Sequence, residues 1–427
     1  MDLAERLRGL GYVSAPRPAA VPSPLPGAAI DDLVPGEWRE TPHGRCFVAC
    51  SRYPLQHEHG GVALRQALDL RAADLARLGR SADLKELDFA TTAFLDTETT
   101  GLAGGTGTYV FLVGLGYFTG DGFVVEQYFM GEYGEEPAML AALSAGLARF
   151  AAVVTFNGKA FDWPLLRTRF DMHRRALPVS EPLHLDLLFP ARRLWRERLG
   201  SCCLSFLEAG ALGLQRTLDV PGWLIPSLYF QYVRERDARP LRPVFAHNEQ
   251  DVLSLLALTV RLGRHWQDPL RESAHPLDLF ALGRTFEIDQ DWGTAALCYE
   301  EALARGLPGG KHQEALFRLG MTYKRLAKLD DAERVWRTLV SRPSAALLTP
   351  HVELAKYLEH REKRYAEAAL VVERALALLA RQVGSPWQAQ RSNQERTGLE
   401  HRLRRLRRRT AAGASGGDSQ AWREERQ

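Results

Sequence analysis

The apolar and polar positions of the chain follow different periods in different segments. Between residues 91 and 170, short apolar runs alternate with helical patterns, which predicts strands at 91–96, 109–118, 123–130 and 152–156, and helices at 137–150 and 161–170. A Gly-Asp-Gly turn at 120–122 joins two of these strands into a hairpin. Strands followed by an alternating α/β stretch predict a mixed sheet with helices on its faces.

Helical periods dominate after residue 201, and part of that region repeats. Between 277 and 381, the pattern of Gly283, Ala295 and Tyr299 recurs 37 residues later as Gly320, Ala332 and Trp336. Small residues at fixed offsets let the two helices of a hairpin approach closely, and aromatic residues fill the gaps between neighbouring hairpins. Such units stack because none buries its apolar face alone. The pattern resembles the tetratricopeptide repeat, although a non-repetitive helical bundle could also produce it.

Both ends of the chain are polar or rich in proline. The first 36 residues are Ala/Pro-rich, and such a segment is expected to be disordered. Residues 37–90 predict short strands and a helix. The end of the chain carries six arginines between positions 402 and 409, followed by a Gly/Ser/Ala stretch. This basic run could contact phosphates or could be a solvated helix end.

Composition places the chain among ordinary globular proteins. It is 45% hydrophobic and 25% charged, with a formal net charge of +3, so a nucleic-acid-binding patch would have to be local. The longest nearly uninterrupted apolar run, 109–118, is shorter than the roughly 20 residues that span a bilayer. Because the first residues also lack a signal-peptide pattern, we expect a cytoplasmic protein with no membrane partner. Five cysteines without a CxxC pair do not predict a disulfide framework.

The first candidate for chemistry is a pair of acids, Asp96 and Glu98, at the end of the apolar strand predicted at 91–96. Strand positions i and i+2 project to the same face. Two carboxylates side by side repel each other unless a cation lies between them, and Mg²⁺ or Mn²⁺ prefers such oxygen ligands. A polar strand end that meets solvent gives the same pattern, so the pair alone is weak evidence.

Further acids strengthen this interpretation. Asp162 ends the segment NGKAFD, which follows another strand, and it could be a helix N-cap as well as a ligand. His247 and Asp251, at the start of a helix predicted to run to residue 265, are four apart and share a face. Phosphodiester hydrolysis requires an activated water and charge neutralisation at the leaving oxygen, which two divalent cations can supply. A histidine can accept the proton of the attacking water near neutral pH.

Three of these segments resemble a known family. DTETTGL, TFNGKAFDWPLL and HNEQD are similar to the three exonuclease motifs of the DEDD superfamily, which has the ribonuclease-H-like fold. HLDLLFPARRLWRERLGSCCLSFLE and DVPGWLIPSLYF resemble the bacterial YprB-type branch, in which tetratricopeptide repeats often follow the ribonuclease-H-like domain. The resemblance covers about residues 38–265 and, more loosely, the repeats.

The resemblance implies roles for the candidate residues. Asp96, Glu98, Asp162 and Asp251 would be the four carboxylates that bind two Mg²⁺ or Mn²⁺ ions, and His247 would be the general base. One feature departs from the family pattern. The DEDD subgroup that uses histidine usually places it five residues before the last aspartate, whereas here it stands at the spacing of four that the tyrosine subgroup uses. The assignment of the base therefore stays open.

Other residues are candidates for substrate binding. Arginines and an aromatic residue interleave in a predicted helix, which suits phosphate contacts and base stacking, although the same pattern fits an exposed helix face. The turn before Asp162 could touch the scissile phosphate or terminal sugar. The candidates are Asn157, Lys159, Arg192, Arg193, Trp195 and Arg196.

The sequence therefore predicts an α/β ribonuclease-H-like mixed sheet followed by an all-α, tetratricopeptide-type repeat domain. The expected segments are a disordered arm (1–36), an N-terminal extension (37–90), the exonuclease domain (91–265), the repeats (275–381) and a basic, disordered tail (384–427). The leading hypothesis is a two-metal 3′→5′ exonuclease that binds nucleic acid and, through its repeats, a protein partner. A structure-specific endonuclease and a non-catalytic nucleic-acid-binding scaffold remain alternatives. DNA and RNA are not distinguished.

Overall fold

The computed structural model describes residues 27–101, 105–217, 219–341, 348–381 and 386–424. Most of the arm expected at 1–36 lies outside these residues. The chain divides into two compact units: the first comprises residues 1–55, 89–182 and 216–253, and the second comprises 56–88, 183–215 and 254–427. Residues 56–88 of the second unit therefore interrupt the sequence of the first unit, between β2 and β5.

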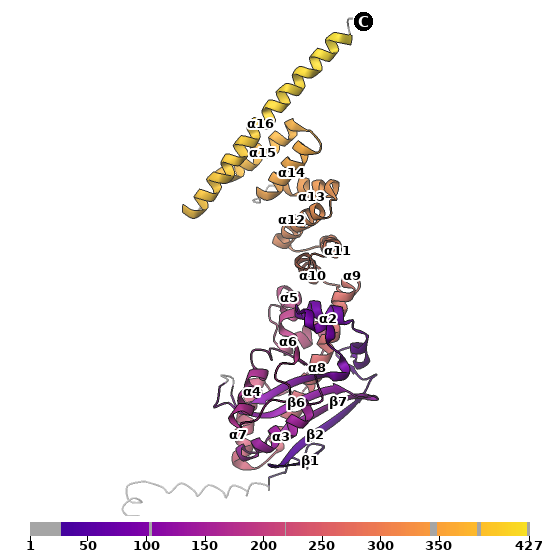
Figure 1. Cartoon of the computed structure of the whole chain (residues 1–427), viewed down its shortest axis with the longest axis vertical. Coiled ribbons are helices and arrows are strands. Elements are labelled where there is room, and N and C mark those ends of the chain that lie inside the picture. Colours follow the sequence, from indigo (N-terminus) through magenta and orange to yellow (C-terminus); the bar gives the residue numbers. More distant parts are fainter. Residues whose placement is uncertain (1–26, 102–104, 218, 342–347, 382–385, 425–427) are drawn as a thin grey trace, which may run out of the picture. The chain divides into compact units, whose positions relative to one another are not determined.

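The first unit contains six of the seven strands of a mixed sheet (Figure 1). The order is β1 (Gly36–Thr41), β2 (Gly44–Pro54), β7 (Gly122–Phe129), β6 (Val110–Phe118), β5 (Thr92–Thr99) and β8 (Ala152–Thr155). All neighbours are antiparallel except β5 and β8, which are parallel. This confirms the predicted mixed sheet. It also extends the sheet, because β1 and β2 come from the segment that was expected to be a separate extension.

Helices cover the sheet, and their packing fixes where the acids lie. The helices of this unit are α3 (Glu136–Leu147), α4 (Asp162–Met172), α7 (Ile225–Glu235) and the first half of α8 (Arg242–Gln267), with short 3₁₀ turns at Phe89–Thr91, Tyr133–Glu135, Gly222–Leu224 and Arg239–Leu241. Helix α3 packs against β1, β2 and β7, whereas α7 packs against β5. Together with the sheet they enclose a core of buried aliphatic and aromatic side chains.

Two glycines of β6 let α8 lie close to the sheet. A Cβ added to Gly114 would collide with Asn248, and one added to Gly116 would collide with Val252. These glycines therefore face α8. Asp96 of β5 pairs with Gly114, and directly opposed residues of an antiparallel pair lie on the same face. Asp96 and, two residues later, Glu98 consequently face α8.

The second unit is mainly helical. It contains β3 (Glu58–His59), β4 (Val62–Ala63), β9 (Leu183–Asp186), 3₁₀ turns at Leu64–Asp69 and Ala82–Glu86, and the helices α2 (Ala72–Gly79), α5 (Leu188–Leu199), α6 (Leu204–Leu207) with a π-helical turn (Glu208–Leu212), and α9 (Pro269–Glu272). Then follow α10 (Pro276–Ile288), α11 (Trp292–Ala304), α12 (Gly309–Arg325), α13 (Leu329–Val340), α14 (Leu348–His360), α15 (Tyr365–Arg381) and α16 (Pro386–Glu424).

Successive helices from α10 to α15 pack as pairs, as expected for a helical repeat region. The predicted repeat positions are equivalent in space. A Cβ on Gly283 of α10 would lie 2.6 Å from the ring of Tyr299 in α11, and one on Gly320 of α12 would lie 2.6 Å from the ring of Trp336 in α13. In both pairs a glycine makes room for the aromatic residue 16 positions later. The assignment to the tetratricopeptide class stays a prediction.

The first repeat helix is not separate from the preceding chain. Helix α10 packs against α5. Arg198 Nε lies 2.8 Å from Asp278 Oδ1, and Arg284 Nη1 lies 2.7 Å from Glu197 Oε1. The repeats therefore continue from a segment that the sequence analysis placed inside the exonuclease domain.

The segment expected to be a disordered tail differs from that expectation, because residues Pro386–Glu424 form α16. Leu399 and Leu406 of this helix are buried in a core shared with α14 and α15. The fully buried carboxylate of Glu359 in α14 accepts hydrogen bonds from Arg402 and Arg405 at 2.5 and 2.8 Å. Several arginines of the basic run thus share one helix face and neutralise acids of the repeats, which weakens their interpretation as phosphate contacts.

We expect acid to destabilise the second unit through His265 in α8. Its imidazole is buried, Nδ1 lies 2.7 Å from Ser273 Oγ, and its ring meets Trp195 edge-on. Burial, helped by the charges of Arg261 and Arg198, lowers the pKa of His265 from 6.5 to about 4. The folded state therefore binds this proton less readily than the unfolded state does.

The contribution of this neutral imidazole to stability is complete above pH 6.5 and is lost as the pH falls towards 4. The loss should reach about 3 kcal/mol. The free energies of unfolding of the wild type and of His265→Gln, measured with urea, should therefore converge as the pH falls from 6.5 to 4. A difference that does not change with pH would contradict the assignment.

Among the residues that the structure describes, no helix is long and apolar enough to cross a membrane.

Candidate functional site

The candidate site lies in the first unit, where the carboxyl-terminal half of β5 faces α8. Asp96 and Glu98 project from β5 towards this helix, and the side chain of Glu98 is only 12% exposed. Between them, Thr97 points the other way and its hydroxyl donates a hydrogen bond to Asp162 Oδ1. The end of β5 thus carries Asp96 and Glu98 on one face and binds Asp162 through Thr97 on the other. Acids from distant parts of the sequence therefore lie near one another.

A tight turn places Asp162 at the start of α4. Asn157 has a φ of +65°, and its carbonyl accepts hydrogen bonds from the backbone N–H groups of Ala160 and Phe161, each at 3.2 Å. The carbonyl of Gly158 accepts from Trp163 N at 2.9 Å. Asp162 is buried as the first residue of α4, so the turn holds its carboxylate against Thr97 rather than in solvent.

Gly158 is required for this turn, because a Cβ there would collide with the side chain of Thr155. We expect Gly158→Ala to lower the free energy of unfolding by about 1–3 kcal/mol, the usual cost of overpacking. It should also displace Asp162 and so reduce any activity of the site. Thermal unfolding measures the first effect. The exposed Gly120, with no atom near its added Cβ, is the matched control, and equal losses from Gly120→Ala and Gly158→Ala would contradict the argument.

A line of amide hydrogen bonds fixes Asp96 from the side of α8. Gln127 Nε2 of β7 donates to Phe245 O at 2.8 Å and to Asn248 Oδ1 at 2.9 Å. Asn248 Nδ2 donates in turn to Asp96 Oδ2 at 2.8 Å. All of these groups are buried or nearly so, and the fixed amide orientations present a donor, not an acceptor, to the carboxylate.

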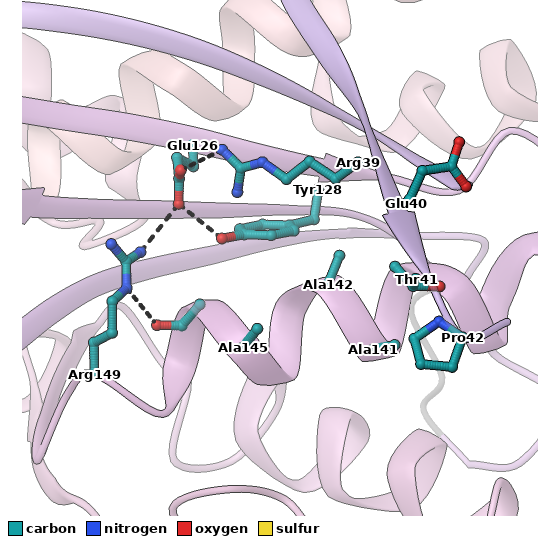
Figure 2. Close-up of a pocket in the computed structure, with 11 residues that line it drawn as sticks. Arg39, Glu40, Thr41, Pro42, Glu126, Tyr128, Ala141, Ala142, Ala145 and Arg149 are labelled. Carbon is teal, nitrogen blue, oxygen red and sulfur yellow. Dashed lines mark hydrogen bonds and ion pairs between the residues drawn. The ribbon is translucent and has the colours of Figure 1, made fainter. Parts of the chain in front are cut away.

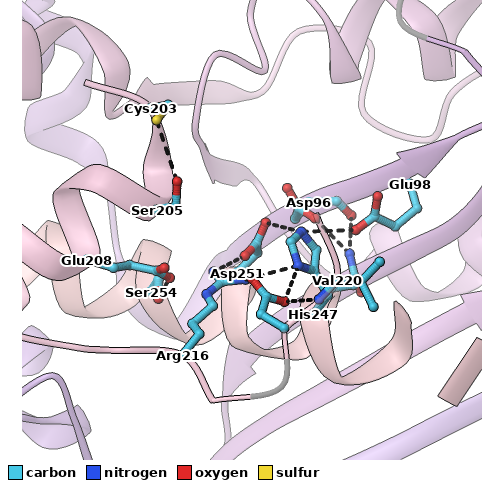
Figure 3. Close-up of polar contacts among 12 residues, drawn as sticks. Asp96, Glu98, Cys203, Ser205, Glu208, Arg216, Val220, His247, Asp251 and Ser254 are labelled. Atoms are coloured by element: carbon cyan, nitrogen blue, oxygen red, sulfur yellow. Dashed lines mark hydrogen bonds and ion pairs between the residues drawn. The ribbon is translucent and has the colours of Figure 1, made fainter. Parts of the chain in front are cut away.

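His247, Asp251 and Arg216 form the other half of the site (Figure 3). The imidazole Nε2 of His247 lies 3.6 Å from Asp251 Oδ2 and 4.0 Å from Glu98 Oε1. The guanidinium of Arg216, which is 7% exposed, forms an ion pair with Asp251 Oδ1 and lies 3.1 Å from His247 Nδ1. On the same side, Asp219 Oδ1 lies 2.7 Å from His247 Nδ1.

The site carries more negative than positive charge. Burial raises the pKa of Asp96 well above its usual value, and the charges of Asp251, Glu98 and Asp162 raise it further. Burial likewise raises the pKa of Glu98, followed by the charges of Asp251 and Asp162, while Arg216 lowers it. The four acids therefore influence each other electrostatically, and the neighbouring guanidinium compensates them only in part.

The charge and oxygen chemistry of this cluster fit divalent cations of the Mg²⁺ or Mn²⁺ type, which prefer carboxylate ligands. The side-chain orientations do not form a ready-made cage. Within the described parts of the chain, no three histidine, cysteine or acidic side chains form a group that could hold a metal ion. The carboxylates instead have protein donors: Asn248 for Asp96, Thr97 for Asp162 and Arg216 for Asp251. Binding an ion would require these acids to exchange partners.

The structure thus brings Asp96, Glu98, Asp162, His247 and Asp251 into one cluster. Asn157 and Lys159 are exposed in the turn that leads to Asp162. Of the remaining candidates, Arg192 and Arg196 are exposed on α5 in the second unit.

Two substrate-binding predictions on α5 require correction. Trp195 is fully buried and packs against His265, so it cannot stack on a base. The guanidinium of Arg193 is largely buried and donates a hydrogen bond to the carbonyl of Leu78, and burial lowers its pKa to about 10. The interleaving of arginines with an aromatic residue suggested an exposed binding face. The helical period instead places Trp195 on the apolar stripe with Leu188 and Ala191.

Four residues of the site were not among the predicted ones: Thr97, Arg216, Asp219 and Asn248. Thr97 and Asn248 directly adjoin predicted residues, and strand and helix geometry could have indicated them. No sequence signal points to Arg216. Asp219 opens the segment DVPGWLIPSLYF, but the resemblance gives it no role, and a loop brings both residues to α8 only in the folded chain.

A pocket elsewhere in the first unit lacks the chemistry of the candidate site (Figure 2). It has a volume of about 320 Å³ and lies between β1, β7 and α3. Its buried acid, Glu126, accepts from Arg39 at 2.6 Å, Arg149 at 3.1 Å and Tyr128 at 2.7 Å. Burial opposes ionisation of Glu126, but the hydrogen bonds from Arg39 and Tyr128 outweigh it and lower its pKa. This network is internally neutralised, which favours a structural role.

Comparison with known proteins agrees with the geometry. The RNase H superfamily model matches residues 93–263, which include every acid of the candidate site. YprB of Bacillus subtilis (strain 168), an uncharacterized protein, is 31% identical over 335 residues, covering 78% of this chain and 80% of YprB. The chain therefore belongs to the YprB family and carries a domain of the RNase H superfamily at residues 93–263.

Proposed function

We propose that the protein is a metal-dependent nuclease that hydrolyses phosphodiester bonds of nucleic acid from the 3′ end. Membership of the RNase H superfamily implies a nuclease hydrolase. The observation that carries the finer proposal is the cluster of four carboxylates from three separate segments, in which burial and the neighbouring charges raise the pKa values of Asp96 and Glu98, with a histidine beside them. A protein keeps such repelling charges together at a cost to stability, which favours a functional reason.

In this proposal, Asp96, Glu98, Asp162 and Asp251 hold two Mg²⁺ or Mn²⁺ ions. Two divalent cations at such a site activate the attacking water and stabilise the leaving oxygen of an in-line displacement. The chain's own part is to supply the oxygen ligands from rigid elements. Asp96 and Glu98 come from a strand in the middle of the sheet, and Asp162 and Asp251 come from helices that pack on it.

His247 is proposed to accept the proton of the attacking water. Its Nε2 faces Glu98 and Asp251, two of the proposed ligands, at 4.0 and 3.6 Å. A base near those carboxylates can reach a water that lies between them and the substrate. The distances support this role despite the unusual spacing between His247 and Asp251.

Substrate contacts are proposed for the exposed Asn157 and Lys159, which lie in the turn before Asp162. The exposed Arg192 and Arg196 of α5 stay candidates for phosphate contacts, whereas Arg193 is bonded to the carbonyl of Leu78 and Trp195 is buried, so neither is proposed to contact the substrate. The helical repeats are proposed to bind a protein partner.

A nuclease assay on purified full-length protein tests the function. Single-stranded DNA and RNA, labelled at either the 3′ or the 5′ end, are incubated with Mg²⁺, Mn²⁺ or chelator. We expect 3′-labelled oligonucleotides to release the label as a mononucleotide and 5′-labelled oligonucleotides to become shorter stepwise. Both results should require metal. Internal fragments would instead indicate an endonuclease, and 5′ mononucleotide would indicate the opposite polarity. Absence of cleavage on every substrate and metal would contradict a nuclease.

A further inference from the structure

We propose that Asp219 is a positioning residue that fixes the tautomer and orientation of His247. This inference rests on the proposed function and adds to it a role for Asp219, which opens the segment DVPGWLIPSLYF but to which neither the sequence motifs nor the superfamily match assigns a function. The starting observation is the contact of 2.7 Å between Asp219 Oδ1 and His247 Nδ1 (Figure 3). A carboxylate only accepts hydrogen bonds, so the shared proton belongs to Nδ1 of the imidazole.

This proton position has a consequence for the other ring nitrogen. In a neutral imidazole with the proton on Nδ1, Nε2 carries the lone pair. Nε2 is the atom that lies near Glu98 and Asp251, at 4.0 and 3.6 Å. The contact with Asp219 therefore directs the basic nitrogen towards the proposed ligands, where the attacking water would lie.

Asp219 is itself held in place. The backbone N–H of Val220 donates to Asp219 Oδ1 at 2.9 Å, and the side chain of Val220 is buried in the core of the unit. Arg216 Nη1 lies 3.4 Å from Asp219 Oδ2 while its other amino group pairs with Asp251. Arg216 thus ties the orienting carboxylate to a proposed ligand and keeps the imidazole between them.

The position of Arg216 determines the result that we expect when the charge of Asp219 is removed. Its Nη1 lies 3.1 Å from His247 Nδ1, and a guanidinium can only donate. In the wild type, the shorter contact with a charged acceptor keeps the proton on Nδ1. In Asp219→Asn, the neutral amide competes weakly and Arg216 donates to Nδ1. The imidazole proton then moves to Nε2, and the lone pair no longer faces the ligands.

The test combines a spectroscopic and a kinetic measurement on full-length protein. Nitrogen-15 NMR of histidine-labelled protein at pH 8.5, with His247 assigned by its loss in His247→Ala, reports which nitrogen is protonated. We expect the Nδ1–H tautomer in the wild type and Nε2–H in Asp219→Asn. Asp219→Glu keeps the charge and should restore the wild-type tautomer at least in part. The Nε2–H tautomer in wild-type protein would overturn the proposal.

The kinetic arm uses 3′-labelled oligonucleotides with Mn²⁺. Asp219→Asn should lower kcat by about 10²–10⁴-fold with KM changed only slightly, because the wrong tautomer of a catalytic histidine costs most of its contribution. The double variant Asp219→Asn/His247→Ala should be no slower than His247→Ala alone, since Asp219 acts through His247. Additive losses would show an independent role. The tautomer is measured without substrate, so inactivity of wild-type protein would count against the proposed function and not against the positioning role.

Discussion

Replacing Asp96 by asparagine should reduce cleavage to background while leaving the protein at least as stable as the wild type. The charge of Asp96 is unfavourable in the free protein, because burial and three neighbouring carboxylates raise its pKa. Asparagine keeps the shape and an oxygen that can accept the hydrogen bond from Asn248 Nδ2. The substitution removes the negatively charged oxygen that the proposed ions require as a ligand. Activity and stability are therefore expected to change in opposite directions, which distinguishes a functional acid from a structural one.

The measurement is a cleavage time course with Mn²⁺ beside a thermal unfolding curve and a Mn²⁺-binding isotherm. Asp121→Asn is the matched control, since Asp121 lies in the exposed turn between β6 and β7 and contacts only Thr119 among the described hydrogen bonds. The control should keep wild-type cleavage and metal binding. If Asp96→Asn protein, free of contaminating nuclease, cleaves at the wild-type rate, this site is not the active centre.

The sheet and the acids were predictable because local rules decided them. The apolar strand that ends in Asp-Thr-Glu forms β5, with its acids on one face, and the segment NGKAF leads into α4, close to the helix predicted at 161–170. The roles of Gly114 and Gly116 cannot be predicted from the neighbouring sequence. Their role depends on α8, which lies more than a hundred residues further along the chain.

Residues that act through tertiary contacts were not predictable. Arg216 and Asp219 stand in a loop of ordinary composition, and only the fold brings them to His247. The differences from expectation at Trp195 and in the basic tail have another cause. The density of arginines in both segments suggests an exposed helix face. The spacing of Trp195 with Leu188 and Ala191, and of Leu399 with Leu406, nevertheless indicates an apolar stripe among the arginines.

Contacts between α5 and α10 determine how the two predicted domains can be separated. Ending the chain near Pro269 would remove α10 and leave the acid Glu197 and the base Arg198 of α5 without their partners Arg284 and Asp278. It would also uncover the face of α5 on which α10 packs. Loss of activity in such a truncation could therefore reflect damage to the second unit, so point substitutions in the first unit test the site more directly.

Replacing His247 by alanine should lower kcat by about 10²–10⁴-fold, the usual contribution of a general base. Metal affinity should fall much less than in Asp96→Asn, because the imidazole lies beside Glu98 and Asp251 without replacing either carboxylate. This combination separates a base from a ligand: a ligand variant loses bound Mn²⁺, whereas a base variant binds Mn²⁺ and turns over slowly. His43→Ala, in the exposed turn between β1 and β2, is the matched control and should be indistinguishable from wild type. An unchanged kcat in His247→Ala would exclude it as the base and would leave the carboxylates to position the attacking water alone.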